Sequence, residues 1–248
     1  MHKIINLTPE KNATRSVGEY VSRVLGDSTS TSYMSYYAES YIALSGSDWS
    51  NFDSVVNESI VFMFVRNPYD RLISSFIHTC LSLDYTETNP KWYFDFPITK
   101  ENQLKCFKNF CMTFAKKEMN NAHINLQTDV INLHVNFVIN NFTRSFGEEF
   151  GRKIRVSDFN NPYFSIIPYI ENEKIFIGKV ENIKNDLSKL VLHFGDNLLV
   201  RTKTVPEWIG DNSEIKFSKD YRDWYDDELY DLMTPIFKKE LEVLNYGF

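Results

Sequence analysis

Glycine, cysteine and long apolar runs are scarce in this sequence of 248 residues. None of the 9 glycines lies between Met1 and Val17, so the phosphate-binding loop GxxxxGK(S/T) is missing from the N-terminal region. The 3 cysteines, Cys80, Cys106 and Cys111, form no CxxC pair and have no nearby histidine at zinc-ligand spacing. We therefore expect reduced thiols and no metal site.

An excess of positive charge is missing as well. The 27 Lys and Arg residues face 33 Asp and Glu residues, and the resulting net charge of −6 argues against a nucleic-acid partner. A small anionic ligand fits this balance, because a phosphate site needs only a few local cations and backbone amides. The apolar stretch of residues 1–7 is too short for a signal segment or a membrane span. We therefore expect a soluble, cytoplasmic protein.

The sequence does contain the periodic apolar pattern of a folded α/β protein. Six consecutive apolar residues at 60–65 predict a strand that is buried on both faces of a parallel sheet. Further strands are expected at 3–7, 175–178 and 198–200. Helices are expected near 17–25, 68–77, 101–119, 128–150, 182–193 and 224–244, with irregular or loop structure at 27–53, 84–100 and 203–220. Because no repeat or linker interrupts this pattern, we expect a single domain over 1–248.

The first candidate site follows the N-terminal strand, where Lys11-Asn12-Ala13-Thr14-Arg15-Ser16 leads into a helix. A helix that opens with such a turn offers unpaired N–H groups, the positive end of its dipole and a mobile cation. This arrangement suits phosphate or sulfate. An ordinary capped helix start has a similar sequence, so the pattern alone leaves both interpretations open.

The second candidate site follows the strand at 60–65. Arg66 comes at the carboxyl end of this strand, where open α/β sheets bind their ligands, and its planar fork matches phosphate oxygens. Asn67 is a suitable helix cap, Pro68 fits the first helical position, and Ser74 on that helix offers a hydroxyl donor. The alternative is that Arg66 pairs with a carboxylate.

Together the two segments resemble the family of sulfotransferases that use 3′-phosphoadenosine 5′-phosphosulfate (PAPS). Residues 11–16 are similar to the 5′-phosphosulfate loop of the family, K-x-G/A-S/T-T-S. The run VRNPYDRLISSF, which begins at Val65, resembles the 3′-phosphate motif V-R-D/N-P-x-D/E-R-L-x-S-x-Y/F, with both arginines, the proline and the first serine in register.

Three later segments extend the resemblance over nearly the whole chain. Asn121–Gln127 is similar to N-P-H-W-x-P-Q of the carbohydrate-type branch, the Golgi-type group that resembles sulfotransferase family 2. Ile175–Asn182 resembles D-F-V-G-R-Y/L-E-N, and the tail from Asn212 to Tyr246 resembles N-x-S, Y-x-x-E-L and F-G-Y in that order. Three positions depart from the family pattern: Arg15 stands in place of Thr, Ile124 in place of Trp, and Val180 in place of an aromatic residue.

The resemblance implies a three-layer α/β sandwich with a mainly parallel sheet, similar to the P-loop NTPase fold. It implies PAPS as co-substrate, bound by Lys11, Asn12, Ala13, Thr14, Arg15, Ser16, Arg66 and Ser74. It also implies that Lys11 contacts the bridging oxygen of the donor and that a His or Glu acts as general base. His123 is the first candidate for that base, and Glu39 and His78 are the alternatives.

The predicted function is transfer of a sulfuryl group from PAPS to a hydroxyl of an acceptor, most simply a glycan. Two alternatives stay open at this stage. One is a small-molecule kinase with a P-loop-like fold, although the sequence lacks its phosphate loop. The other is a protein that binds 3′-phosphoadenosine nucleotides without turnover, which Arg15 motivates. Neither the oligomeric state nor the acceptor follows from the residues.

Overall fold

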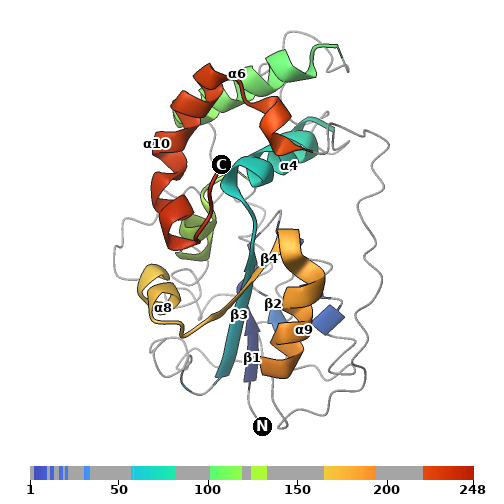
Figure 1. The fold of residues 1–248 in the computed structure, drawn as a ribbon, viewed down its shortest axis with the longest axis vertical. Coiled ribbons are helices and arrows are strands. Elements are labelled where there is room, and N and C mark those ends of the chain that lie inside the picture. The colour runs from blue at the N-terminus through green and yellow to red at the C-terminus, as the bar shows by residue number, and fades with distance from the viewer. Residues whose placement is uncertain are drawn as a thin grey trace, which may run out of the picture. The chain divides into compact units, whose positions relative to one another are not determined.

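The computed structural model describes residues 3–9, 12–13, 17–18, 20–21, 31–33, 57, 59–81, 101–118, 124–132, 165–193 and 220–248 (Figure 1). The chain divides into two compact units. The first comprises Met1–Arg66 and Gln127–Asn212, and the second comprises Asn67–Leu126 and Ser213–Phe248. The single domain expected over 1–248 stays a prediction.

The first unit holds a parallel sheet. Its strands within the described residues are β1 (Lys3–Asn6), β2 (Thr31–Tyr33), β3 (Ser59–Val65) and β4 (Phe176–Lys179), in the order β2-β1-β3-β4. All neighbouring strands pair in parallel, with Ile4 opposite Thr31 and Ile60, and Met63 opposite Ile177. The expected parallel sheet is thus confirmed, with three of its strands at the expected places.

Strand β2 corrects one expectation, because Thr31–Tyr33 lies in the stretch that was expected to be irregular. The strand is three residues long and carries no apolar run, so its sequence gives no periodic signal. It forms where its backbone pairs with β1 at the edge of the described sheet. Thr and Tyr are compatible with such a position, since both are favoured in strands.

The continuous apolar run of β3 is explained by burial on both faces of the sheet. Phe62 and Phe64 pack against α9 (Ile183–His193) and against the helical residues 17, 20 and 21. The partners on that face are Val17, Tyr20, Val21, Ile183, Leu187 and Leu190. Val61, Met63 and Val65 alternate with the two phenylalanines and are buried as well. A strand buried on both sides needs apolar residues at every position.

The second unit is helical in its described part. It contains α4 (Pro68–Leu81), α6 (Gln103–Ala115), the 3-10 turn η4 (Tyr221–Trp224) and α10 (Asp227–Val243). The predicted start of α4 is confirmed, since Asn67 Oδ1 accepts from the N–H of Tyr69 at 3.0 Å and Pro68 occupies the first helical position.

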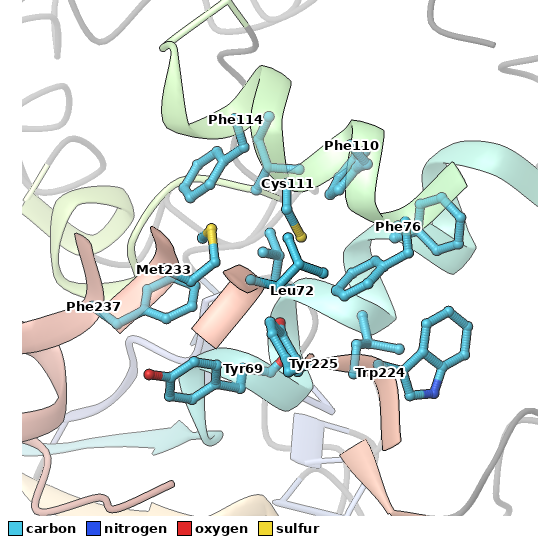
Figure 2. Close-up of a cluster of buried hydrophobic side chains, with 14 of the residues drawn as sticks. Tyr69, Leu72, Phe76, Phe110, Cys111, Phe114, Trp224, Tyr225, Met233 and Phe237 are labelled. Carbon is cyan, nitrogen blue, oxygen red and sulfur yellow. The ribbon is translucent and has the colours of Figure 1, made fainter. Parts of the chain in front are cut away.

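Aromatic side chains from all of these helical elements form the core of the second unit (Figure 2). Tyr69 packs edge-on against Tyr225 and Phe237, with ring centroids 5.0 and 5.1 Å apart. Cys106 and Cys111 are buried in the same cluster as free thiols, as expected, and burial raises the pKa of both. These thiols are therefore protonated and unreactive at neutral pH.

The remaining described elements are α8 (Ile167–Glu171), η3 (Val180–Asn182) and a helical segment at 127–132. Alpha helix α8 was not expected from the sequence. Of the expected elements, the strand at 198–200, most of the helix at 128–150 and the loops at 84–100 and 203–219 lie outside the described residues. In the described part of the chain no helix combines the length and hydropathy that a membrane span requires.

Candidate functional site

The strand order of the first unit marks one edge of its sheet as the candidate site. The chain leaves β1 to form β2 on one side and then crosses to form β3 on the other side, so the order reverses between β1 and β3. Open α/β sheets bind ligands at the carboxyl ends of the strands that flank such a point. Here β1 leads into the loop that contains residues 11–16, and β3 leads into Arg66. Both sequence-predicted segments therefore start at this edge.

Side chains of the loop after β1 replace backbone partners at the end of β3. The last regular bond on this side joins the N–H of Leu7 to the carbonyl of Phe62 at 2.8 Å. Two residues further along β3, the N–H of Phe64 donates to Thr8 Oγ1 and its carbonyl accepts from Asn12 Nδ2, both at 3.0 Å. Thr8 and Asn12 are buried, so these bonds fix the loop to the strand.

Gln127 continues this pattern at Arg66. Its Oε1 accepts from the N–H of Arg66 and its Nε2 donates to the carbonyl of Arg66, each at 2.9 Å. The same Oε1 accepts from Asn12 Nδ2 at 2.5 Å. Gln127 is fully buried and reaches this point from the start of the helical segment at 127–132. Gln127 was not among the predicted site residues, although its place at the end of the Asn121–Gln127 motif was a signal.

Asn12 and Ala13 show two departures from ordinary structure within the loop. Asn12 Oδ1 is buried and has no hydrogen-bond partner among the described residues, a costly state for a carbonyl oxygen. Ala13 has a φ of 58°, in the left-handed region that disfavours residues with a Cβ. Such strain gathers at functional sites. It also explains glycine as one of the residues of the motif pattern at this position, since glycine has no Cβ.

The other predicted site residues are placed as follows. Arg66 is half-buried at the end of β3, and Ser74 is half-buried on α4 in the second unit. His78 belongs to α4, but its side chain lies outside the described set. The predicted residues that lie wholly outside the described part are Lys11, Thr14, Arg15, Ser16, Glu39 and His123.

Arg71, the second arginine of the 3′-phosphate motif, has a structural contact. Its side chain is buried, and Nη1 donates to the carbonyl of Asn125 at 2.6 Å. Both residues belong to the second unit. Arg71 thus holds the segment that precedes Gln127. This contact gives a structural reason for the second arginine of the 3′-phosphate motif.

The motif segment Ile175–Asn182 has a structural reason for its glycine. A Cβ on Gly178 would lie 2.4 Å from Cε1 of Phe64, so no larger residue fits without displacing that ring. Asp186 then fixes the turn after β4, because its carboxylate accepts from the N–H of Lys179 at 2.9 Å and from Asn182 Nδ2 at 3.0 Å.

The tail motif contacts the start of α4 in the second unit. Tyr225 donates its hydroxyl to the carbonyl of Tyr69 at 3.0 Å, and burial raises the pKa of Tyr225 well above its usual value. Asn67 Nδ2 donates to the carbonyl of Gly247 at 2.9 Å and to the hydroxyl oxygen of Tyr221 at 3.2 Å. The residues directly after Arg66 are therefore held by the tail.

Comparison with known families gives a match over nearly the whole chain. The model of a family described as the sulfotransferase family matches residues 2–247. The chain belongs to the sulfotransferase family. No match was found among curated proteins or solved structures. Sulfotransferases of this family are enzymes that take the sulfuryl group from PAPS, so this membership decides against the small-molecule kinase.

The described sheet edge contains part of the residues that the donor of a sulfotransferase would contact. PAPS is an anion with a phosphate at its 3′ position and a phosphosulfate at its 5′ position, so it needs a cation or N–H donors at each end. Arg66 offers a guanidinium at one segment of the edge. The strained loop at Asn12 and Ala13 offers a second segment that is already fixed to β3. No rearrangement of β3 is required to bring the two segments to the same edge.

Proposed function

We propose that this sulfotransferase transfers a sulfuryl group from PAPS to a hydroxyl of a carbohydrate. The observation that carries the proposal is the placement of both donor motifs after β1 and β3, the two strands at which the sheet order reverses. The carbohydrate acceptor is supported by the resemblance of Asn121–Gln127 and Ile175–Asn182 to the carbohydrate-type branch.

We also propose the three-layer sandwich of the P-loop type for the sheet and its helices. One face of β3 is covered by α9 and by the residues at 17–21. On the other face Val61 is 2% exposed and Met63 and Val65 are 0% exposed, which supports a second covering layer on that face. Parallel strands with both faces covered form the middle layer of such a sandwich, and the burial of β3 supports this arrangement.

The donor-binding roles follow the motifs. Lys11–Ser16 would hold the 5′-phosphosulfate through amides, hydroxyls and the cations of Lys11 and Arg15, and Arg66 and Ser74 would hold the 3′-phosphate. Support comes from the backbone of Arg66, which both atoms of the Gln127 amide fix, and from the strained loop at Ala13.

PAPS supplies an activated sulfuryl group, and the protein must position the acceptor and stabilise the charge that develops. The ammonium of Lys11 would neutralise negative charge on the departing oxygen, an effect on the order of 3 kcal/mol in the barrier. His123 would accept the proton of the acceptor hydroxyl, with Glu39 and His78 as alternatives. Positioning and electrostatics suffice for such a transfer, so no metal is required.

The test begins with calorimetric titration of adenosine 3′,5′-bisphosphate and continues with sulfate transfer from labelled PAPS to a panel of glycans. We expect binding and transfer to at least one glycan. Arg66→Ala should weaken bisphosphate binding by about 1.5–3 kcal/mol, the range for hydrogen bonds to charged groups. Arg222→Ala is a matched control, because Arg222 is exposed and pairs with Asp220 at 3.2 Å. Binding without any transfer would favour the non-catalytic alternative, and no binding would refute the proposed site.

A further inference from the structure

Gln127 satisfies both backbone groups of the residue proposed to bind the 3′-phosphate. Regular pairing between β1 and β3 ends at Asn6 and Phe62. Beyond that point the backbone groups on the same side of β3 belong to Phe64 and then to Arg66. The Gln127 amide pairs with the N–H and the carbonyl of Arg66, each at 2.9 Å. A carboxamide can do this because it carries one acceptor and one donor group on the same carbon.

The oxygen of the same amide also holds the loop proposed to bind the 5′-phosphosulfate. Asn12 Nδ2 donates to Gln127 Oε1 and to the carbonyl of Phe64, so Asn12 is fixed to both. Asn12 and Gln127 are each 0% exposed, and water cannot replace these bonds without opening the site. A single buried oxygen therefore joins the segments at the two ends of the donor.

We infer that Gln127 is a positioning residue that sets Arg66 and the Asn12 loop at a fixed separation and thereby selects a donor with phosphates at both its 3′ and 5′ ends. The inference rests on the proposed function, and it adds a residue to which neither motif assigned a role. Without the Gln127 amide, the end of β3 loses two bonds and the loop loses one. Arg66 would keep its charge but not its place relative to the loop.

The experiment compares the dissociation constants of adenosine 5′-monophosphate and adenosine 3′,5′-bisphosphate, because their ratio isolates the contribution of the 3′-phosphate. In the wild type the ratio should strongly favour the bisphosphate. Gln127→Leu should reduce it about tenfold, the loss expected when buried hydrogen bonds of this kind are broken. Partial unfolding lowers the apparent affinity for both ligands equally and leaves the ratio unchanged, so a merely structural role of Gln127 would not give this result.

Three variants complete the test. Gln127→Glu keeps the size of the side chain and its acceptor oxygen but loses the N–H donor to the carbonyl of Arg66. It should therefore also lower the ratio of the two dissociation constants, and it replaces the leucine variant if that variant folds poorly. Gln103→Leu makes the same change on α6 and should leave the ratio as in the wild type. In an Arg66→Ala background, Gln127→Leu should cause no further fall. A wild type without preference for the bisphosphate would refute the proposed site and the inference together, whereas a normal preference that Gln127→Leu and Gln127→Glu both leave unchanged would refute the inference alone.

Discussion

Ala13 has the least favourable backbone among the residues described in the donor loop. Its φ of 58° places the Cβ near the following carbonyl oxygen, at a cost of about 1–2 kcal/mol. Glycine has no such cost but loses more entropy on folding. Ala13→Gly should therefore raise the free energy of unfolding by about 0.5–1 kcal/mol, as measured by urea denaturation. The same substitution at Ala115, the last residue of α6, should not raise it, because Ala115 has no positive φ for glycine to relieve. Equal effects at both positions would contradict the strain at Ala13.

Lys11 is the residue that we expect to contribute most to the chemical step. The amides of a helix start can bind the phosphosulfate in the ground state without an ammonium. The ammonium becomes important when negative charge develops on the departing oxygen, so Lys11→Ala should lower kcat more than it weakens nucleotide binding. Lys11→Arg should recover only part of the rate, because a planar fork places its charge differently. Single-turnover transfer and bisphosphate titration measure the two effects. Equal losses would make Lys11 an anchor only, and an unchanged rate would assign the role to Arg15.

At the residue scale, the sequence was informative where side-chain chemistry is local and uninformative where it depends on the fold. Asn67 was predicted to cap α4, because cap and helix are adjacent in sequence. The hydrogen bonds of Gln127 to Arg66 join residues 61 positions apart. A local sequence pattern therefore does not predict the partner of Gln127. The strained backbone of Ala13 was likewise invisible, since alanine is usually a helix former.

At the scale of elements, burial decides what a sequence can predict. Strand β3 was predictable because both its faces are buried and six of its seven positions are apolar. Edge strand β2 and the five-residue helix α8 were missed, since each is shorter than the window in which periodicity can be recognised. The carboxyl ends of β1 and β3 were predicted as ligand sites, but their adjacency in the sheet required the observed strand order.

The packing of β4 on β3 depends on the absence of a side chain at residue 178. Gly178→Ala would place a Cβ 2.4 Å from the ring of Phe64, and overpacking of this kind costs about 1–3 kcal/mol. Gly247→Ala is the control, because no atom of the described part of the chain lies within 4 Å of a Cβ at that position. Guanidinium denaturation should show a lower midpoint for the first variant and little change for the second. Adding Phe64→Leu to Gly178→Ala should restore part of the loss, and a neutral Gly178→Ala would refute the close packing.

Helix α10 should contribute a pH-dependent term to stability through its cap. Asp226 accepts from the N–H of Leu229 at 2.8 Å and pairs with Lys108 at 3.1 Å, and these two contacts, the backbone bond first, lower the pKa of Asp226 below 3.8. A carboxyl whose pKa is lower in the folded state stabilises the protein above its unfolded pKa and loses this effect as the pH falls through the folded value. Asp226→Ala should cost about 1 kcal/mol at neutral pH and less below the ordinary pKa.

Urea denaturation of wild type and Asp226→Ala at neutral pH and near pH 3 measures this difference. Asp231→Ala, an exposed change within the same helix, is the control and should be nearly neutral at both values. A cost for Asp226→Ala that stays constant with pH would show that its charge is irrelevant to the cap.

At the scale of the whole molecule, the path of the chain bears on cooperativity. The chain passes between the two compact units after residues 66, 126 and 212, so neither unit is one continuous segment. Each unit consists of two chain segments that the other unit joins. Such a unit is not expected to unfold independently. We therefore expect calorimetry to show a single transition, with agreement between the calorimetric and van't Hoff enthalpies.

Donor binding should raise the temperature of that single transition. A ligand that binds only the folded state adds about 2.7 kcal/mol at a concentration one hundred times its dissociation constant. For a chain of this size each kcal/mol shifts Tm by about 2–4 °C, so adenosine 3′,5′-bisphosphate should raise Tm by about 5–10 °C. Adenosine, which lacks both phosphates, should cause almost no shift, and Arg66→Ala should reduce the shift produced by the bisphosphate at equal concentration. Two separate transitions, of which the bisphosphate moved only one, would show that the units unfold independently and that the donor is bound by one of them alone.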